Sequence, residues 1–143
     1  MERPKVGFGI MLLKDGKVLL GKRNDDSSKA DSDLHGEGTW TFPGGKLGFG
    51  EKLIEGVSRE LKEETGIELL KAEAISVTDD IVHDNHYVTV GFLCTEFNGE
   101  AEVLEPEEIT EWKWFLLTEL PENLYLPTKV MIENYLNKKV YKE

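Results

Sequence analysis

The sequence predicts an α+β protein with a mixed β-sheet and helices packed on its faces. Two observations support this class: apolar segments of strand length outnumber segments with helical spacing, and the two kinds are interleaved along the chain. A chain of 143 residues is long enough to bury one hydrophobic core but not two independent cores. We therefore expect a single domain over residues 1–143.

Six segments have the composition or the alternation of β-strands. They are residues 6–13, 18–23, 39–42, 71–82, 86–97 and 112–116. The Asp15-Gly16 pair between the first two segments is typical of a hairpin turn, and so are residues 83–85 between the fourth and the fifth. Pro43 and the two glycines after it should form a turn that leads into a helix.

Two segments have the spacing of helices. In residues 52–65, apolar side chains recur every three or four positions, and Gly66 provides a C-terminal stop. Residues 127–139 form a second, amphipathic helical pattern that starts with a proline. Residues 24–38 are polar and without periodicity, which predicts a long loop that is either a lid, a binding loop or an insertion without function.

The charge balance limits the partners that the protein can bind. The 17 basic and 28 acidic residues give a formal net charge of −11, which argues against broad binding to nucleic acid polymers or anionic membranes. If the substrate is a phosphate compound, metal ions and a few local cations must reverse the potential at the site. The sequence has no apolar run near the roughly 20 residues that a membrane helix needs.

The first residues and the cysteine content indicate a compartment. The chain starts with a short polar stretch that leads into an apparent strand, without a signal-peptide pattern. Cys94 is the one cysteine in the sequence, which excludes an internal disulfide and fits a reducing cytoplasm. Its apolar, strand-like surroundings predict a packed thiol rather than a nucleophile. We expect a cytoplasmic protein.

The helix predicted over residues 52–65 carries a dense group of acids. Glu60, Glu63 and Glu64 lie on one face, where like charges repel by roughly 0.2–0.5 kcal/mol per pair. A solvated acidic face is the simpler interpretation of such a run. The neighbouring Arg59 and the preceding glycines and Glu51 favour a loop-and-helix cluster of carboxylates, which is the arrangement that hard divalent cations require.

These residues form a pattern that resembles the signature of the Nudix hydrolases, the MutT-like family. The sequence reads Gly45, five residues, Glu51, seven residues and then RELKEETGI from Arg59 to Ile67, which matches every fixed position. The order of the predicted strands resembles the Nudix αβα sandwich over most of the chain. The resemblance implies hydrolysis of a nucleoside diphosphate linked to another group, with Mg²⁺ or Mn²⁺ as cofactor.

The resemblance assigns catalytic roles position by position. Glu60, Glu63 and Glu64 match the helix carboxylates that bind the metals, and one of them, or a downstream glutamate, acts as the base for water. The backbone carbonyl of Gly44 matches a further metal ligand. Arg59 matches the arginine that orients the acidic cluster by ion pairing.

Other positions of the signature match structural residues. Glu51 matches the glutamate that anchors the loop, and Gly45 and Gly66 match the glycines of the motif. Many members have an acidic residue where this sequence has Gly48, and this departure puts an outer metal site in question without affecting the helix ligands.

Outside the signature, the resemblance suggests two further site residues, and the loop of the signature itself contains a third candidate. Glu107 is the best match to a glutamate that precedes a late aromatic strand, with Glu105 and Glu108 as competitors and a solvated acidic loop as the alternative. Arg23 resembles a cation that contacts substrate phosphates, although an exposed base at a strand end is equally expected. Lys46, directly after the glycine pair, is a second candidate for substrate binding.

The chain as a whole resembles the small nucleoside-triphosphate diphosphatases of the family. The resemblance rests on the segments RPKVGFGI, LLGKR, FPGGKLGFGE, NHYVTV and EPEEITEWKWF. It implies a small-molecule nucleotide substrate, modified or oxidised nucleotides included, and release of a monophosphate and pyrophosphate. The alternative substrate is ADP-ribose or another nucleoside diphosphate derivative. Relatives of this kind are often homodimers, which makes a homodimer one expectation.

An alternative of another class is a Nudix module that binds a nucleotide as a sensor without catalysis. Such modules are expected to lose signature carboxylates, and this sequence retains them. In either class, base recognition needs an aromatic side chain for stacking. The aromatic candidates are Trp40, Phe42, Phe49, Tyr87 and Trp114.

Overall fold

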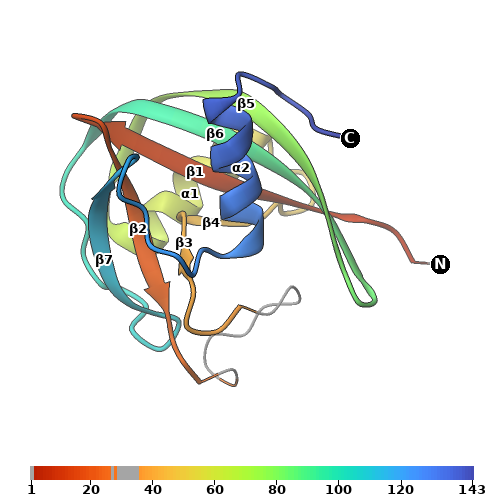
Figure 1. Ribbon diagram of the computed structural model, residues 1–143, viewed down its shortest axis with the longest axis horizontal. Coiled ribbons are helices and arrows are strands. Elements are labelled where there is room, and N and C mark those ends of the chain that lie inside the picture. Colours follow the sequence, from red (N-terminus) through yellow and green to blue (C-terminus); the bar gives the residue numbers. More distant parts are fainter. Residues whose placement is uncertain (1, 27, 29–35) are drawn as a thin grey trace.

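A computed structural model describes residues 2–26, 28 and 36–143, which fold into a seven-stranded sheet covered by helices (Figure 1). The main path of the sheet runs β3 (Trp40–Thr41), β2 (Lys17–Arg23), β1 (Lys5–Lys14), β6 (Asn85–Asn98) and β5 (Glu68–Val82). Off this path, β4 (Gly44–Lys46) pairs with β1, and β7 (Ile109–Leu116) pairs with β2. The β1–β6 pair is parallel, whereas the β1–β2, β1–β4, β2–β3, β2–β7 and β5–β6 pairs are antiparallel.

The helices α1 (Leu53–Thr65) and α2 (Leu126–Leu136) lie on opposite faces of this mixed sheet (Figure 1). Successive side chains of a strand point to opposite faces. Ile10 of β1 therefore belongs to the core that includes Leu61 of α1. Its neighbour Met11 belongs to a second core, which α2 covers. The arrangement is an αβα sandwich and confirms the predicted fold class.

Most of the expected elements form close to their expected positions. The first hairpin turns at Asp15 and Gly16, both of which have a positive φ. The β5–β6 hairpin turns at residues 83–84, and β5 begins at Glu68 rather than at residue 71. Strand β7 also begins earlier than expected, at residue 109, and α2 ends at residue 136 rather than 139.

The expected turn after Pro43 is wrong, because Gly44, Gly45 and Lys46 form the short strand β4. This strand pairs antiparallel with Gly7–Gly9 of β1. A Cβ atom on Gly44 would collide with the carbonyl oxygen of Phe8, so the close approach of these strands requires glycine. Strand β4 brings the start of the signature against the centre of the sheet.

Both ends of the loop expected over residues 24–38 are attached to the fold. The backbone N–H of Asn24 donates to the carbonyl oxygen of Glu108 at 2.9 Å, and the N–H of Gly38 donates to the carbonyl oxygen of Asn24 at 3.0 Å. Residues 27 and 29–35 lie outside the described residues. The role of this loop as a lid or binding loop stays a prediction.

Cys94 is buried in the core beneath α1, as the sequence predicts. Its Sγ donates to the carbonyl oxygen of Glu96 at 3.3 Å, and burial raises the pKa of the thiol. Of the helices in the part of the chain that the structure describes, none is long and apolar enough to cross a membrane.

Replacing Leu61 by alanine should lower the free energy of unfolding by about 2–5 kcal/mol. Leu61 is fully buried between α1 and the sheet, so truncation leaves a cavity in the core. Leu136→Ala, at the exposed end of α2, is the control and should change the stability by less than about 0.5 kcal/mol. Urea unfolding followed by circular dichroism measures both variants, and equal losses would contradict the central position of Leu61.

Candidate active site

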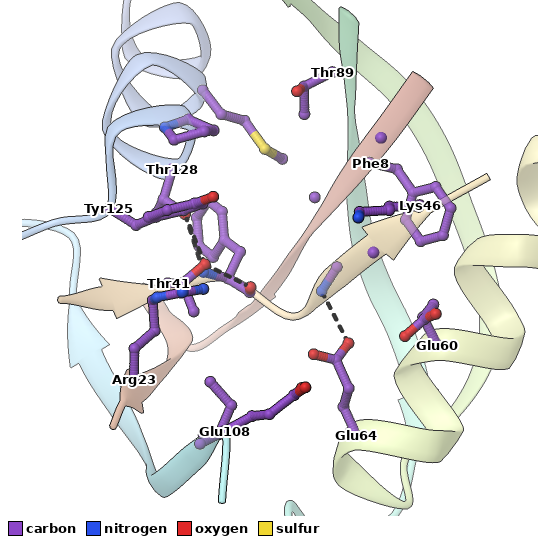
Figure 2. Close-up of a pocket in the computed structure, with 18 of the residues that line it drawn as sticks. Phe8, Arg23, Thr41, Lys46, Glu60, Glu64, Thr89, Glu108, Tyr125 and Thr128 are labelled. Carbon is purple, nitrogen blue, oxygen red and sulfur yellow. Dashed lines mark hydrogen bonds between the residues drawn. The ribbon is translucent and has the colours of Figure 1, made fainter. Parts of the chain in front are cut away.

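Helix α1, which carries the acidic cluster, is fixed at both ends by backbone contacts. At its start, the N–H of Lys52 donates to Glu55 Oε1 at 2.8 Å. At its end, Gly66 has a φ of 80°, and its N–H donates to a carbonyl oxygen of the last turn. Because the apolar face of α1 packs on the sheet, Glu60 and Glu64 lie along the edge that faces β4 (Figure 2).

Arg59 joins three carboxylates. Its Nε and Nη2 donate to the two Glu51 oxygens at 2.7 and 3.0 Å. Its Nη1 donates to Glu60 Oε1 at 2.8 Å and lies 3.5 Å from Glu63 Oε2. Glu51 Oε1 also accepts the N–H of Gly48 at 3.0 Å, so the loop before the helix is attached to the helix itself. One guanidinium group therefore offsets much of the repulsion expected among these acids.

The Arg59 network has a clear effect on ionisation. The hydrogen bonds from Arg59, followed by the N–H of Gly48, lower the pKa of Glu51 to about 2. The same contacts with Glu51 and Glu60 raise the pKa of the Arg59 guanidinium. Both Glu51 and Arg59 are therefore charged at neutral pH, and the ion pair persists well into the acidic range.

Glu64 and Glu60 lie in a less compensated environment. Glu64 Oε2 accepts the N–H of Gly44 at 3.0 Å (Figure 2). Burial, and then repulsion from Glu60, raises the pKa of Glu64 well above its ordinary value. The pKa of Glu60 is also raised by burial, although the hydrogen bond from Arg59 opposes the change. Because burial penalises the ionised form, these carboxylates need a further cation to hold their negative charge.

The donor groups at this edge fit a hard divalent cation. A Cβ atom on Gly45 would lie 2.6 Å from Glu60 Cδ, so the glycine leaves the space beside this carboxylate open. Among the residues that the structure describes, no three His, Cys, Asp or Glu side chains form a complete metal cage. Mg²⁺ usually takes one or two carboxylates and completes its shell with water and substrate phosphates. The candidate ligands are Glu60, Glu63, Glu64 and the carbonyl oxygen of Gly44.

A cavity of about 470 Å³ opens beside the acidic edge of α1 (Figure 2). Its acidic wall consists of Glu60, Glu63, Glu64, Glu105 and Glu108. Its other end is lined by aromatic, hydroxyl and apolar side chains, namely Thr41, Phe42, Tyr125, Pro127, Thr128 and Met131. The volume lies within the range of roughly 300–1,000 Å³ that is usual for small-molecule sites.

The two cations expected to bind substrate lie on different sides of the cavity. Arg23 Nε donates to the carbonyl oxygen of Gly36 at 3.0 Å, and its guanidinium carbon lies 4.8 Å from the ring centroid of Tyr125. Lys46 Nζ lies 5.8 Å from the ring centroid of Tyr87. In Figure 2, Lys46 is across the cavity from Arg23 and Tyr125. Positive charge therefore flanks the acidic wall on both sides in a protein of formal net charge −11.

The structure places Glu105 and Glu108, rather than Glu107, at the cavity. The N–H groups of Glu108 and Ile109 both donate to the carbonyl oxygen of Glu105 at 3.0 Å, which makes a tight turn. Residues three apart in such a turn share a side, which agrees with Glu105 and Glu108 lining the cavity while Glu107 does not. Burial, followed by repulsion from Glu108, raises the pKa of Glu105.

Two of the five aromatic candidates for base stacking line the cavity. They are Phe42 and Tyr87. Trp40 and Trp114 instead pack against other aromatic side chains in the two cores. Phe49 is fully exposed in the loop before α1 and does not line the cavity.

Sequence reasoning missed the contribution of α2 to the cavity. Thr128 Oγ1 accepts the N–H of Phe42 at 3.1 Å and lies 3.3 Å from Thr41 Oγ1, which attaches the start of α2 to β3. Tyr125, directly before this helix, lines the same end of the cavity. A proline near a helix start marks the element, but no local pattern indicates that residues distant in sequence meet there.

Comparison with known proteins identifies the family. A model of the NUDIX domain matches residues 3–135. The ADP-ribose pyrophosphatase of Methanocaldococcus jannaschii is 29% identical over 93% of this chain and 73% of its own length. The RNA pyrophosphohydrolase of Bartonella clarridgeiae is 32% identical over 79% of this chain and 76% of its own. The 8-oxo-dGTP diphosphatase of Proteus vulgaris is 30% identical over 70% of this chain and 85% of its own length.

A solved structure has the same fold. The crystal structure of a MutT NUDIX hydrolase from Burkholderia pseudomallei aligns with a TM-score of 0.82 and 35% identity, over 92% of this chain and 98% of that one. The fold and the acidic helix define a hydrolase that acts on phosphoric anhydrides. The chain belongs to the Nudix hydrolase family, as the signature from Gly45 to Ile67 predicts.

The Glu51–Arg59 pair should stabilise the protein in a pH-dependent way. The folded-state pKa of Glu51 is about 2, below its ordinary value of 4.5, so its stabilisation is present above about pH 4.5 and is lost as the pH falls toward 2. Glu51→Gln should therefore be less stable than the wild type at about pH 6, and the difference should shrink toward about pH 3. Urea unfolding at several pH values measures this, and a constant difference would contradict the ionic role of Glu51.

Proposed function

We propose that the protein hydrolyses a nucleoside triphosphate to a nucleoside monophosphate and pyrophosphate, with Mg²⁺ or Mn²⁺ bound at the acidic edge of α1. The observation that carries this proposal is one cavity of about 470 Å³ that combines five carboxylates, two cations and an end lined by aromatic and hydroxyl side chains. A single nucleotide suits this size and this division into polar and stacking parts. Triphosphates with a modified or oxidised base belong to the same class.

In the proposed reaction, a water oxygen bonds to a phosphorus atom while the bridging P–O bond breaks. The bound cation supplies charge stabilisation and lowers the pKa of the attacking water. Arg59 keeps the Glu60 carboxylate oriented through its 2.8 Å hydrogen bond. A carboxylate on the cavity wall, Glu64 or Glu108, accepts the proton from water. Lys46 balances the negative charge of the phosphates, and Arg23 adds positive charge on the other side of the cavity.

The opposite end of the cavity suits the base of the nucleotide. Tyr125 and Phe42 offer aromatic surfaces, and an aromatic face is a common stacking partner for a planar base. Thr41 and Thr128 offer hydroxyl groups that can donate or accept hydrogen bonds. The guanidinium of Arg23, which packs on the Tyr125 ring at 4.8 Å, adds rigidity to this end.

A second candidate substrate is ADP-ribose, because the M. jannaschii relative is named an ADP-ribose pyrophosphatase. The same carboxylates and cations would serve this reaction, since it also breaks a phosphoric anhydride. A triphosphate at the end of an RNA chain is less favoured. The formal net charge of −11 repels a polyanion that extends beyond the cavity.

Glu64→Gln should reduce kcat by about 10²-fold or more while the fold is retained. The substitution removes the charge of a cavity carboxylate that both the cation and the water need in the proposed mechanism. Glu68→Gln, at the exposed start of β5, is the control and should keep wild-type activity. Chromatography of products in Mg²⁺ measures turnover, and full activity of Glu64→Gln would contradict the mechanism.

A panel of substrates identifies the reaction in the same assay. It contains canonical and oxidised nucleoside triphosphates, ADP-ribose and triphosphate-terminated RNA. Monophosphate and pyrophosphate from a free triphosphate support the proposal. If only ADP-ribose is hydrolysed, to AMP and ribose phosphate, or if only RNA is hydrolysed, the proposed substrate is wrong. The proposed location of the active site would still stand.

Substituting three neighbouring glutamates one at a time tests which of them contribute to catalysis from the acidic wall of the cavity. Glu108→Gln and Glu105→Gln should lower kcat, because both side chains line the cavity. Glu107→Gln is the matched control and should leave kcat within about twofold of the wild type, since the Glu107 side chain does not line the cavity. Steady-state kinetics at saturating Mg²⁺ measures all three. If Glu107→Gln lowers kcat more than the other two substitutions, Glu107 is the catalytic glutamate of this segment.

A further inference from the structure

Tyr87 lies beside the cavity at a point where three strands meet. It is buried in β6, and its register partner on the parallel strand β1 is Lys5. Lys5 Nζ lies 5.7 Å from the Tyr87 ring centroid, and Lys46 Nζ of β4 lies 5.8 Å from it. Both distances fall within the roughly 6 Å over which an ammonium group is attracted to an aromatic face. Two lysines from different strands therefore share one ring.

Gly7 allows Lys46 to reach this ring. In the sheet, Gly7 pairs with Lys46 of β4 on one side and with Thr89 of β6 on the other. To reach the Tyr87 ring on β6, the Lys46 side chain therefore passes over β1 at Gly7. Glycine has no side chain that would obstruct this path. A Cβ atom on Gly7 would lie 3.6 Å from the Tyr87 ring and 3.2 Å from the carbonyl oxygen of Gly45, which would narrow the path.

The shared ring concentrates positive charge at one end of the cavity. Each ammonium lies within 6 Å of the same centroid, so the two nitrogens are at most about 12 Å apart, close to the Debye length at 0.1 M salt. Lys46 lines the cavity, whereas Lys5 lies on the other side of the ring in a neighbouring pocket, so an anion bound next to Lys46 is attracted directly by Lys46 and at longer range by Lys5. The opposite end, at Tyr125 and Thr128, has the aromatic and hydroxyl groups suited to a base.

From this arrangement we propose that Tyr87 is a positioning residue, which holds Lys46 and Lys5 as a paired cation site for the terminal phosphates of the substrate. These are the phosphates that leave as pyrophosphate, so the inference rests on the proposed triphosphate hydrolysis. The acidic edge of α1 then lies between the base and the terminal phosphates, next to the anhydride that breaks. Lys46 contacts the phosphates from the cavity wall, and Lys5 acts from behind the ring.

Three variants and one control variant test the pair of lysines. Lys5→Gln and Tyr87→Leu should raise KM for a nucleoside triphosphate and weaken binding of inorganic pyrophosphate about two- to fivefold, with kcat nearly unchanged. Tyr87→Phe keeps the ring and should retain most of the affinity that Tyr87→Leu loses. Lys14→Gln, at the other end of β1, is the control for a general loss of positive charge. The effect of Lys5→Gln should shrink as salt is added.

Each result of these measurements either supports or contradicts the proposed roles of the Tyr87 ring and the two lysines. Equal losses in Tyr87→Phe and Tyr87→Leu would assign the effect to the hydroxyl group and overturn the role of the ring. Equal behaviour of Lys5→Gln and Lys14→Gln would overturn the pair, and this comparison remains valid if the buried Tyr87→Leu substitution prevents folding. The measurements are steady-state kinetics and isothermal titration with magnesium pyrophosphate.

The same measurements separate this inference from the proposed function. If the wild type hydrolyses a triphosphate and Lys5→Gln matches it in KM and in pyrophosphate affinity, only the cation pair fails. If the wild type hydrolyses no triphosphate, the proposed function fails. The titration with pyrophosphate still tests the pair in that case, because binding of this probe requires no turnover.

Discussion

The hydrogen bonds from Arg59 to Glu51 and Glu60 are the contacts on which the geometry of the site depends. They connect the loop after β4 to α1 and hold one carboxylate of the acidic edge in place. They also divide the acids into two groups. Glu51 is held ionised by its cation, whereas Glu64 lies near β4, accepts the N–H of Gly44 and has a raised pKa because of desolvation. The first group supports the structure, and in the proposed mechanism the second would bind a metal ion and water.

An acidic protein can bind a phosphate compound if positively charged side chains lie at the binding cavity. The protein as a whole repels anions, but the cavity has Arg23 on one side and Lys46 on the other. Each cation is held by an aromatic ring, Tyr125 or Tyr87, which limits its conformational freedom. A small ligand that reaches the cavity meets these cations at short range, while a long polyanion remains under the repulsion of the outer surface.

Local sequence patterns predicted the elements but not every contact between them. The period of α1, its stop at Gly66 and the two hairpins follow from neighbouring residues, and they form close to the expected positions. The Gly44-Gly45 pair was expected as a turn because glycines usually indicate one, whereas its pairing with β1 depends on the partner strand. Glu107 matched a spacing, but the turn that starts at Glu105 decides which side chains face the cavity. The cavity residues Tyr125 and Thr128 come from the start of α2 and the position directly before it, which meet the cavity only in three dimensions.

The two helical layers of the sandwich contribute different kinds of side chain to the cavity. Three of the five cavity carboxylates project from α1, which covers one face of the sheet, and Tyr125 and Thr128 of the end suited to a base come from the start of α2, which covers the other. Substitutions near Tyr125 and Thr128 change the second layer without repacking the first. Such an arrangement lets substrate range diverge among descendants of one ancestor while the bond-breaking chemistry is inherited unchanged.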